Sequence, residues 1–280
     1  MLNSELGTLG TPHLNLPDYH IHTALCGHAE GEASDYGSAA KKKGIPEICF
    51  TDHAPNPDGY DPAHRMRLEQ FSLYRDAVAN IQDDGGTRVL FGIEADYYEG
   101  CEQFLKPWLE SQRFDFVLGS VHFIDGWGFD NPEERHIWDS VNISATWRKY
   151  FKSIMRLVDT RLFDAVGHMD IPKKFGHRPP DRDLKEMVQP VLDRLAEAGM
   201  GMELNTSGLR KPVGEIYPSP VILSLARERD IPICFGSDAH SPGEVGADFD
   251  LALKLAHEAG YRDYFRIRQR KMERLPLPEV

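Results

Sequence analysis

Short, continuously apolar segments recur along the chain, each followed by polar residues. Examples are Ile48-Cys49-Phe50, Val89-Leu90-Phe91 and Phe116-Val117-Leu118. Runs of this kind are typical of strands that are covered on both faces, as in a parallel sheet. The pattern predicts strands at residues 17–22, 46–51, 88–95, 114–121, 164–168, 201–205 and 231–236.

Between these segments, apolar residues are spaced three or four positions apart. This spacing is typical of helices that bury one face. Helices are predicted at residues 34–43, 65–83, 144–160, 183–198, 218–229 and 247–259. Ser34 is expected to cap the first of them and Gly44 to end it, while Pro190 is expected to kink the fourth.

The alternation of strands and helices predicts an α/β fold. Such repeats imply right-handed crossovers and a parallel sheet. A closed or nearly closed (β/α)7 barrel is the first choice, and an open doubly wound sheet is the second, since its site would draw on fewer strands. Residues 1–16 are predicted to be an N-terminal leader and 17–280 a single domain. The long segment 124–142 is expected to be a loop covering the site.

Nearly every predicted strand ends on a residue that can bind a metal ion. The endings are Asp18-Tyr19-His20-Ile21-His22, Thr51-Asp52-His53, Ile93-Glu94, Ser120-Val121-His122, Gly167-His168, Met202-Glu203 and Ser237-Asp238-Ala239-His240. The carboxyl ends of barrel strands meet at one end of the barrel, so these side chains are predicted to share a cavity. His20 and His22 alternate on a strand and therefore face the same side, and His28 follows them in a loop.

A histidine in a strand can also be a purely structural residue. That alternative would bury many polar side chains at strand ends without a common partner, which is costly for each one. The pattern therefore favours a metal site. Mixed imidazole and carboxylate ligands suit Zn, Fe or Mn, and the sequence does not choose between them.

Composition narrows the possible partners. The formal net charge of −12 argues against a nucleic-acid surface, which is normally basic, but it allows a small anionic substrate at a metal site. No signal peptide is recognised and no apolar run approaches the roughly 20 residues of a membrane span, so a cytoplasmic protein without a membrane partner is predicted. The four cysteines are expected to be reduced and structural, with Cys26 the candidate exception.

From about residue 18 to 260, the chain resembles the PHP (polymerase and histidinol phosphatase) family. The resemblance implies a distorted (β/α)7 barrel with three divalent metal ions in a cleft at the strand ends. It implies that His20, His22, Glu94 and Asp238 bind the first ion. It implies that Glu94, His122 and His168 bind the second, with Glu94 bridging, and that His28, His53 and His240 bind the third. All of these positions carry residue types that the family accepts.

Longer motifs resemble the histidinol-phosphatase branch of that family. They are Asn205-Thr206-Ser207-Gly208-Leu209-Arg210-Lys211-Pro212, Gly167-His168-Met169-Asp170 with Lys173-Lys174-Phe175-Gly176, and Gly119-Ser120-Val121-His122-Phe123-Ile124-Asp125. They imply a metal-dependent phosphatase that hydrolyses L-histidinol phosphate in histidine biosynthesis.

The chemistry predicted for such a site is attack of a metal-activated water on phosphorus. Glu94 and Asp238 are predicted to be catalytic because they bind the metal ions. Asp52 or Asp238 is a candidate for passing a proton to the leaving group. Arg210 is predicted to clamp the phosphate, since its guanidinium matches two oxygens at once. Further candidates for substrate binding are Lys173, Lys174, Lys211, Asp125 and His177. His64 is classed as a non-ligand.

Two other functions stay open from the sequence. One is a PHP-type phosphomonoesterase or nuclease with a different substrate, although the net acidity weighs against a nuclease. The other is a metal-binding barrel without catalysis that serves as a regulatory module. The sequence predicts no oligomeric state.

Overall fold

Seven parallel strands form the centre of the molecule. The computed structural model describes residues 15–56, 59–81 and 86–279, so nearly all of the predicted leader lies outside the described residues. The strands are β1 (Asp18–Ile21), β2 (Glu47–Phe50), β3 (Arg88–Asp96), β4 (Phe116–Ser120), β7 (Ala165–Val166), β8 (Gly201–Asn205) and β9 (Ile233–Gly236), and they are hydrogen-bonded in that order. Each of them overlaps a strand predicted from the apolar runs.

The sheet curves until its two edge strands nearly meet. Just beyond the end of β1, the His22 amide donates to the carbonyl of Ala239 at 3.0 Å, and the Ala239 amide donates to the carbonyl of His20 at 3.2 Å. Ile21 and Ala239 form an isolated parallel bridge. The predicted fold, a distorted (β/α)7 barrel, is therefore confirmed, and its closure lies at the end where the site residues gather.

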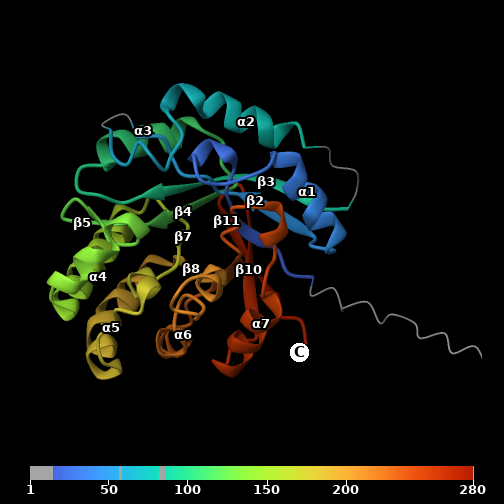
Figure 1. The fold of residues 1–280 in the computed structure, drawn as a ribbon. Helices are drawn as coiled ribbons and strands as arrows, with labels where there is room; N and C mark the ends of the chain where they lie inside the picture. Colours follow the sequence, from blue (N-terminus) through green and yellow to red (C-terminus); the bar gives the residue numbers. More distant parts are fainter. Residues whose placement is uncertain (1–14, 57–58, 82–85, 280) are drawn as a thin grey trace, which may run out of the picture.

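Helices surround the strands on the outside of the barrel (Figure 1). They are α1 (Ala33–Lys42), α2 (Phe71–Ala79), α3 (Glu102–Ser111), α4 (Ile143–Thr160), α5 (Asp181–Ala198), α6 (Pro220–Glu228) and α7 (Phe249–Glu258). Each buries an apolar stripe. In α4 that stripe includes Trp147, Phe151, Ile154 and Leu157, which are at most 2% exposed. This is the one-sided burial that the helical spacing predicts.

Several helix boundaries differ from the prediction. Helix α1 is capped by Glu32, in a reciprocal capping box with Asp35, instead of by Ser34. Its end at Gly44 is as predicted, with a φ of 68°. Helix α5 continues through Pro190. In the predicted helix 65–83, the described part is a short 3-10 turn, Leu68–Gln70, followed by α2.

Helix α3 completes the third strand–helix repeat in a stretch where the apolar spacing predicted no helix. Pro107 lies inside it, and only Leu105 and Leu109 are buried on its inner face. So few buried positions leave the periodic signal too weak to read.

A C-terminal hairpin that the sequence did not predict closes the amino end of the barrel. It consists of β10 (Asp263–Arg268) paired antiparallel with β11 (Lys271–Pro276), and it lies in the middle of the ring of strands (Figure 1). Phe265 packs so tightly on β8 that a Cβ added to Gly201 would lie 2.3 Å from its ring. Arg268 holds Glu47 at 2.6 Å and Arg270 holds Asp164 at 3.1 Å, tying the hairpin to the starts of β2 and β7.

Short elements follow the carboxyl ends of the strands and shape the rim. They are the 3-10 helices η1 (Ala24–Cys26), η4 (Ile171–Phe175), η5 (Ser207–Arg210) and η6 (Pro242–Glu244), together with β5 (Phe123–Ile124), β6 (Trp127–Gly128) and the 3-10 helix η3 (Pro132–Ser140). The last three form the predicted loop 124–142. Trp138 anchors that loop by donating from Nε1 to the carbonyl of Phe129 at 2.7 Å.

All four cysteines are buried and unpaired, as predicted. Within the described part of the chain, none of the helices has the length and apolar character that a membrane span requires.

Candidate metal centre

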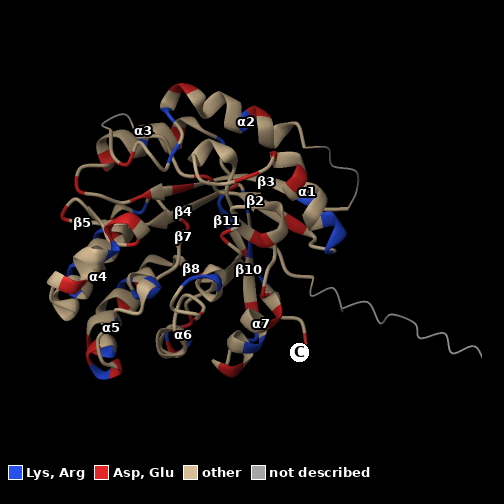
Figure 2. Ribbon diagram, in the orientation of Figure 1, with Lys and Arg blue, Asp and Glu red and all other residues tan. Residues whose placement is uncertain are grey.

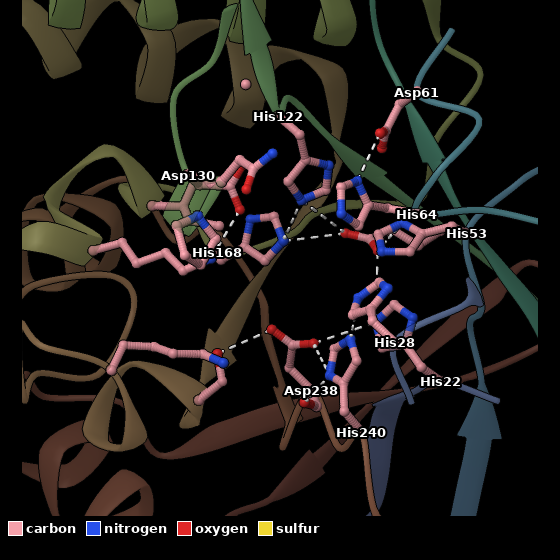
Figure 3. Close-up of a pocket in the computed structure, with 18 of the residues that line it drawn as sticks. His22, His28, His53, Asp61, His64, His122, Asp130, His168, Asp238 and His240 are labelled. Atoms are coloured by element: carbon pink, nitrogen blue, oxygen red, sulfur yellow. Dashed lines mark hydrogen bonds and ion pairs between the residues drawn. The ribbon is translucent and has the colours of Figure 1, made fainter. Parts of the chain in front are cut away.

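The carboxyl ends of the strands surround one cavity of about 480 Å³, a size typical of small-molecule sites. Eight of the predicted metal ligands line it: His22, His28, His53, Glu94, His122, His168, Asp238 and His240. The remaining one, His20, is fully buried, and its Nε2 lies 3.0 Å from Nε2 of His22. The structure therefore brings together all the side chains assigned as ligands, from six strand ends and one loop. Figure 3 labels His22, His28, His53, His122, His168, Asp238 and His240 among them.

The first predicted ligand group is compact. The Nε2 atoms of His20 and His22 lie 3.7 and 3.2 Å from Oδ1 of Asp238. The same two nitrogens lie 3.5 and 3.7 Å from Oε2 of Glu94. Four donor atoms this close together can ligate one cation. The alternation of His20 and His22 on β1 places both imidazoles on the cavity side, as predicted.

The second group shares Glu94 with the first. Oε1 of Glu94 lies 3.1 Å from Nε2 of His168 and 3.8 Å from Nε2 of His122. The two imidazole nitrogens lie 3.3 Å apart. One oxygen of Glu94 thus faces the first group and the other faces the second, which is the geometry of a bridging carboxylate.

The third group is more open. Nε2 of His28 and Nε2 of His240 lie 2.9 Å apart, and the rings of His28 and His53 have centroids 5.7 Å apart. Donor atoms of His22, His53 and His240 also lie within 4.8 Å of one another, as do those of Cys26, His28 and His240. His28 and His240 keep part of their surface exposed to solvent, and several soft or borderline donors surround this group.

Buried partners fix the orientation of the imidazoles. Nδ1 of His20 lies 2.6 Å from Glu203, and Nδ1 of His122 lies 2.7 Å from Asp96. Backbone carbonyls face Nδ1 of His28 and His240 in the same way, at 3.1 and 3.0 Å. An acceptor at Nδ1 places the proton there and leaves the lone pair of Nε2 directed at the cavity, which is how histidine ligands are usually held.

The ionisation states of several cavity residues favour cation binding. Burial alone would raise the pKa of Glu94, but the imidazoles of His53 and His20 outweigh it and hold that pKa well below its usual range. Burial, reinforced by the neighbouring His53 and His22, lowers the pKa of His28 to about 4. Burial and His22 likewise hold the pKa of His240 well below its usual value. The site therefore offers ionised carboxylate and neutral imidazole, the forms that bind metals.

For two other imidazoles, neighbouring carboxylates raise the pKa above its usual value. Burial would lower the pKa of His22, but hydrogen bonding to Asp238 and Asp52 outweighs it and raises the pKa to about 9. For His122, the carboxylate of Asp96 outweighs burial and raises the pKa to about 10. A cation bound at these nitrogens must displace a proton, so its affinity depends on pH.

Unsatisfied atoms test whether the residues fit a metal cluster. Oε2 of Glu94 and Nδ1 of His53 are buried and have no hydrogen-bond partner, although they lie only 3.0 Å apart. Buried polar atoms in proteins are nearly always satisfied, and facing imidazole nitrogens repel unless a proton or cation lies between them. The donor set thus fits bound divalent cations.

Hydroxyl groups support the two carboxylate ligands. Oγ of Ser120 donates to Glu94 at 2.5 Å, and Oγ of Ser207 donates to Asp238 at 2.9 Å. Asp52, a candidate proton shuttle, does not line the cavity. Its carboxylate accepts from the hydroxyl and amide of Thr23 and lies 3.5 Å from Nδ1 of His22, so it is placed to orient that imidazole.

Two of the predicted substrate-binding lysines reach the cavity. Lys174 and Lys211 both line it. Nζ of Lys174 lies 3.1 Å from Asp130, whose carboxylate is in the 123–140 segment. Burial would raise the pKa of Asp130, but Lys174 and His122 outweigh it and hold that pKa below its usual value.

Arg210 and Lys173 are engaged away from the cavity lining. The guanidinium of Arg210 donates to the carbonyl of Ser237 at 2.6 Å and lies 3.2 Å from Glu244. Nζ of Lys173 is buried between Asp170, at 3.1 Å, and Glu215, at 3.0 Å. Neither residue is among those that line the cavity, and their predicted substrate contacts stay predictions.

Asp125 and His177 also lie outside the lining. Asp125 is exposed and pairs with Lys149 at 2.5 Å. The His177 ring stacks on Trp138, with ring centroids 5.1 Å apart and an angle of 8° between the ring planes. This contact holds the 123–140 segment in place. That segment itself borders the cavity through Gly128, Asp130, Asn131, Pro132 and Glu133, as expected of the long loop.

Sequence reasoning missed two residues beside the site, Asp96 and Asp61, and named a third, His64, only as a non-ligand. Asp96 orients His122, and its signal was the spacing Glu94-Ala95-Asp96, which places both acids on one face of β3 just as His20 and His22 share a face of β1. Asp61 and His64 line the cavity mouth from the segment before α2. No periodic signal marks that segment, and only the three-dimensional structure brings it to the site.

Comparisons with known proteins identify the family. The PHP domain model matches residues 18–207, and the PHP-associated model matches residues 222–247. A probable histidinol-phosphatase of Deinococcus radiodurans is 42% identical over 260 residues, covering 92% of this chain and 98% of that protein. The histidinol-phosphatase of Bacillus subtilis is 30% identical over 262 residues, covering 85% of this chain and 98% of its own.

A solved structure shares the fold. The histidinol phosphate phosphatase of Lactococcus lactis, crystallised with zinc, L-histidinol and phosphate, superposes with a TM-score of 0.78 at 21% identity, covering 92% of this chain and 99% of that one. These matches include the strands that carry the predicted ligands and the segments that follow those strands. The chain belongs to the PHP domain family, and within that family it is similar, over most of its length, to proteins named histidinol-phosphatase.

Proposed function

We propose that this protein is a metal-dependent phosphatase that hydrolyses L-histidinol phosphate to L-histidinol and phosphate in histidine biosynthesis. The observation that carries the proposal is the convergence of seven histidines, Glu94 and Asp238 on one cavity. The 42% identity to a probable histidinol-phosphatase supports the choice of substrate.

The cavity is proposed to hold three divalent ions of Zn, Fe or Mn, in the three ligand groups described above. Such ions lower the pKa of a water molecule and stabilise negative charge on phosphoryl and leaving oxygens. Glu94 would hold two of them together through its two oxygens. Asp96 and Glu203 would keep the imidazoles in the tautomer that ligates.

Cationic side chains in the cavity lining are proposed to bind the phosphoryl group. Lys174 and Lys211 line the cavity, and a lysine ammonium can donate to any phosphate oxygen that it reaches. Oγ of Ser207 holds Oδ2 of Asp238 at 2.9 Å, which keeps that carboxylate facing the reaction centre. Phosphate-monoester hydrolysis is very slow without a catalyst, so a cavity of this kind must supply much of the stabilisation by charge.

The cavity lining also suits a cationic leaving group. Asp61, Asp130 and Glu133 line it with carboxylates, and Phe123 and Pro132 add apolar contact area. Histidinol carries an amine and an imidazole, which match carboxylates and apolar surface. Along the described helices, residues of both charge signs are interspersed (Figure 2), and the net charge of −12 weighs against binding of a polyanion.

Phosphate release from a panel of substrates tests the proposal. Purified protein loaded in turn with Zn, Mn or Fe(II) is given L-histidinol phosphate, other small phosphomonoesters and a 5′-phosphorylated oligonucleotide. We expect kcat/KM to be highest for L-histidinol phosphate by at least 100-fold. Faster release from the oligonucleotide would favour a nuclease-like role, and no release with any metal would favour a regulatory barrel.

A further inference from the structure

Arg65 is a buried arginine beside the cavity whose role is not explained by metal or substrate contact. It lies in the segment between β2 and α2, and its side chain is 2% exposed. Burying a guanidinium is costly unless its donors are satisfied in good geometry. Its partners therefore indicate what the charge is there to hold.

The guanidinium contacts three different segments beside the cavity. Nη2 donates to Asp96 on β3 at 2.7 Å and to the side chain of Asp61 at 3.1 Å. Nη1 donates to the carbonyl of Ala54, the residue after His53, at 3.1 Å. The carboxylates it binds are themselves partners of histidines in the cavity.

On one side the chain of contacts ends at a predicted metal ligand. Oδ2 of Asp96 accepts from Arg65, while Oδ1 lies 2.7 Å from Nδ1 of His122. Asp96 is fully buried, so its two oxygens have no water to turn toward. With Asp96 held by Arg65, Nε2 of His122 is directed at His168, 3.3 Å away.

On the other side the chain ends at the cavity mouth. Oδ1 of Asp61 lies 2.8 Å from Nδ1 of His64, and both residues line the cavity. The His64 ring lies edge-on to His28 with centroids 5.5 Å apart. One guanidinium thus sets the positions of a ligand at the second group and of a histidine beside the third (Figure 3 shows both histidines and Asp61).

We propose that Arg65 is a positioning residue that keeps the second metal in place by fixing Asp96, and through it the orientation of His122. An arginine fits this task because its planar fork reaches several acceptors at once and keeps its charge when buried. A lysine ammonium presents all its donors from one nitrogen, whereas Arg65 reaches the Ala54 carbonyl from Nη1 and the carboxylates of Asp61 and Asp96 from Nη2. The inference rests on the proposed metal centre but not on the identity of the substrate.

Metal release tests the proposal without any substrate. The metal-loaded protein and its R65K, R65M, D96N and R65M/D96N variants are placed in excess chelator, and the loss of metal per chain is followed. We expect R65M and D96N to lose about one ion roughly 10- to 100-fold faster than the unmodified protein, the usual effect of removing an orienting partner of a ligand. The double variant should release it no faster than the faster single variant, because both changes break one chain of contacts.

Two controls separate positioning from general loss of stability. Arg67→Met alters an exposed arginine two residues away and should leave release unchanged. Phe265→Ala weakens the far end of the barrel, and it should lower the melting temperature without faster release. If R65M does not fold, the R65K variant tests the proposal instead. We expect it to release metal at least several-fold faster than the unmodified protein. Release at the normal rate in R65K or R65M, multiplicative effects in the double variant, or equally fast release from Phe265→Ala would each overturn the proposal.

Discussion

Glu94 places its negative charge beside more of the cavity histidines than any other side chain described above. Its two oxygens lie between 3.0 and 3.8 Å from imidazole nitrogens of five histidines, which belong to three predicted ligand groups. The sequence placed Glu94 at a strand end, but it could not say that one carboxylate would face so many partners. That follows from the curvature of the sheet, which is a property of the whole barrel.

Replacing Glu94 by Gln should abolish most activity. The amide keeps the shape but removes the negative charge, so the imidazoles lose their common counter-charge and cations bind less tightly. We expect metal content to fall by at least one ion per chain and kcat/KM for L-histidinol phosphate to fall by roughly 100-fold or more, beyond the usual effect of an outer partner. Elemental analysis and phosphate release measure both. Glu99→Gln, at an exposed carboxylate, is the control and should behave as the unmodified protein.

Lys174 makes a separate prediction about substrate binding. A charged hydrogen bond to phosphate contributes about 1.5–3 kcal/mol, so K174M should lower kcat/KM by about 10- to 100-fold while metal content stays unchanged. Steady-state kinetics with elemental analysis checks both parts. K149M removes an exposed lysine paired with Asp125 and should have no effect. Equal kinetics in K174M and the unmodified protein would rule out Lys174 as a phosphate contact.

At the scale of elements, the sequence predicted the strands well and the caps and connections less well. Continuous apolar runs mark buried parallel strands because both faces are covered, and β8 was predicted with its observed bounds, 201–205. The C-terminal hairpin was missed because its turn residues, Gln269 and Arg270, have φ angles of 48° and 60° but are not the Gly or Asn that usually mark such turns.

The predicted phosphate clamp illustrates why side-chain contacts are harder to predict than strand positions. Arg210 has the right chemistry and lies next to the site in sequence, but its direction depends on Glu244 and the Ser237 carbonyl, which approach from after β9. The convergence of the strand-end side chains on one cavity was predictable because the carboxyl ends of barrel strands meet at the same end of the barrel. Rim residues depend on loop conformations for which a single sequence carries little signal.

The hairpin should contribute stability without contributing to catalysis. Truncating the buried ring in Phe265→Ala leaves a cavity against Gly201, and such changes cost about 3–5 kcal/mol. We expect the free energy of unfolding to fall by that amount in chemical denaturation, with kcat unchanged at a temperature where the variant is folded. Leu73→Ala, at an exposed position, should change stability by less than about 0.5 kcal/mol. A large loss of kcat in folded Phe265→Ala would show that the two ends of the barrel are coupled.

At the scale of the whole molecule, metals and fold are expected to stabilise each other. A barrel whose one end is lined with repelling imidazoles and an unsatisfied buried carboxylate gains stability when cations bind only the folded state. Each site occupied at about 100 times its dissociation constant adds about 2.7 kcal/mol.

Removing the metals should therefore lower the melting temperature by several degrees. Exhaustive chelation followed by calorimetry measures the shift, and adding Zn or Mn back should restore it. A protein treated with the chelator already saturated by calcium serves as the control. An unchanged melting temperature after verified removal of all metal would contradict the charge balance described for the cavity.

The hairpin that closes the amino end of the barrel follows all seven strands of the barrel in the chain, so it is synthesised after them. Until β10 and β11 leave the ribosome, the aromatic and thiol side chains at that end of the barrel, among them Phe116, Cys49 and Cys234, have no cover from Phe265 and Ile267. A nascent chain stalled before residue 263 would expose these aromatic and thiol side chains to solvent and to oxidants, so synthesis of the hairpin protects the barrel interior as well as stabilising it.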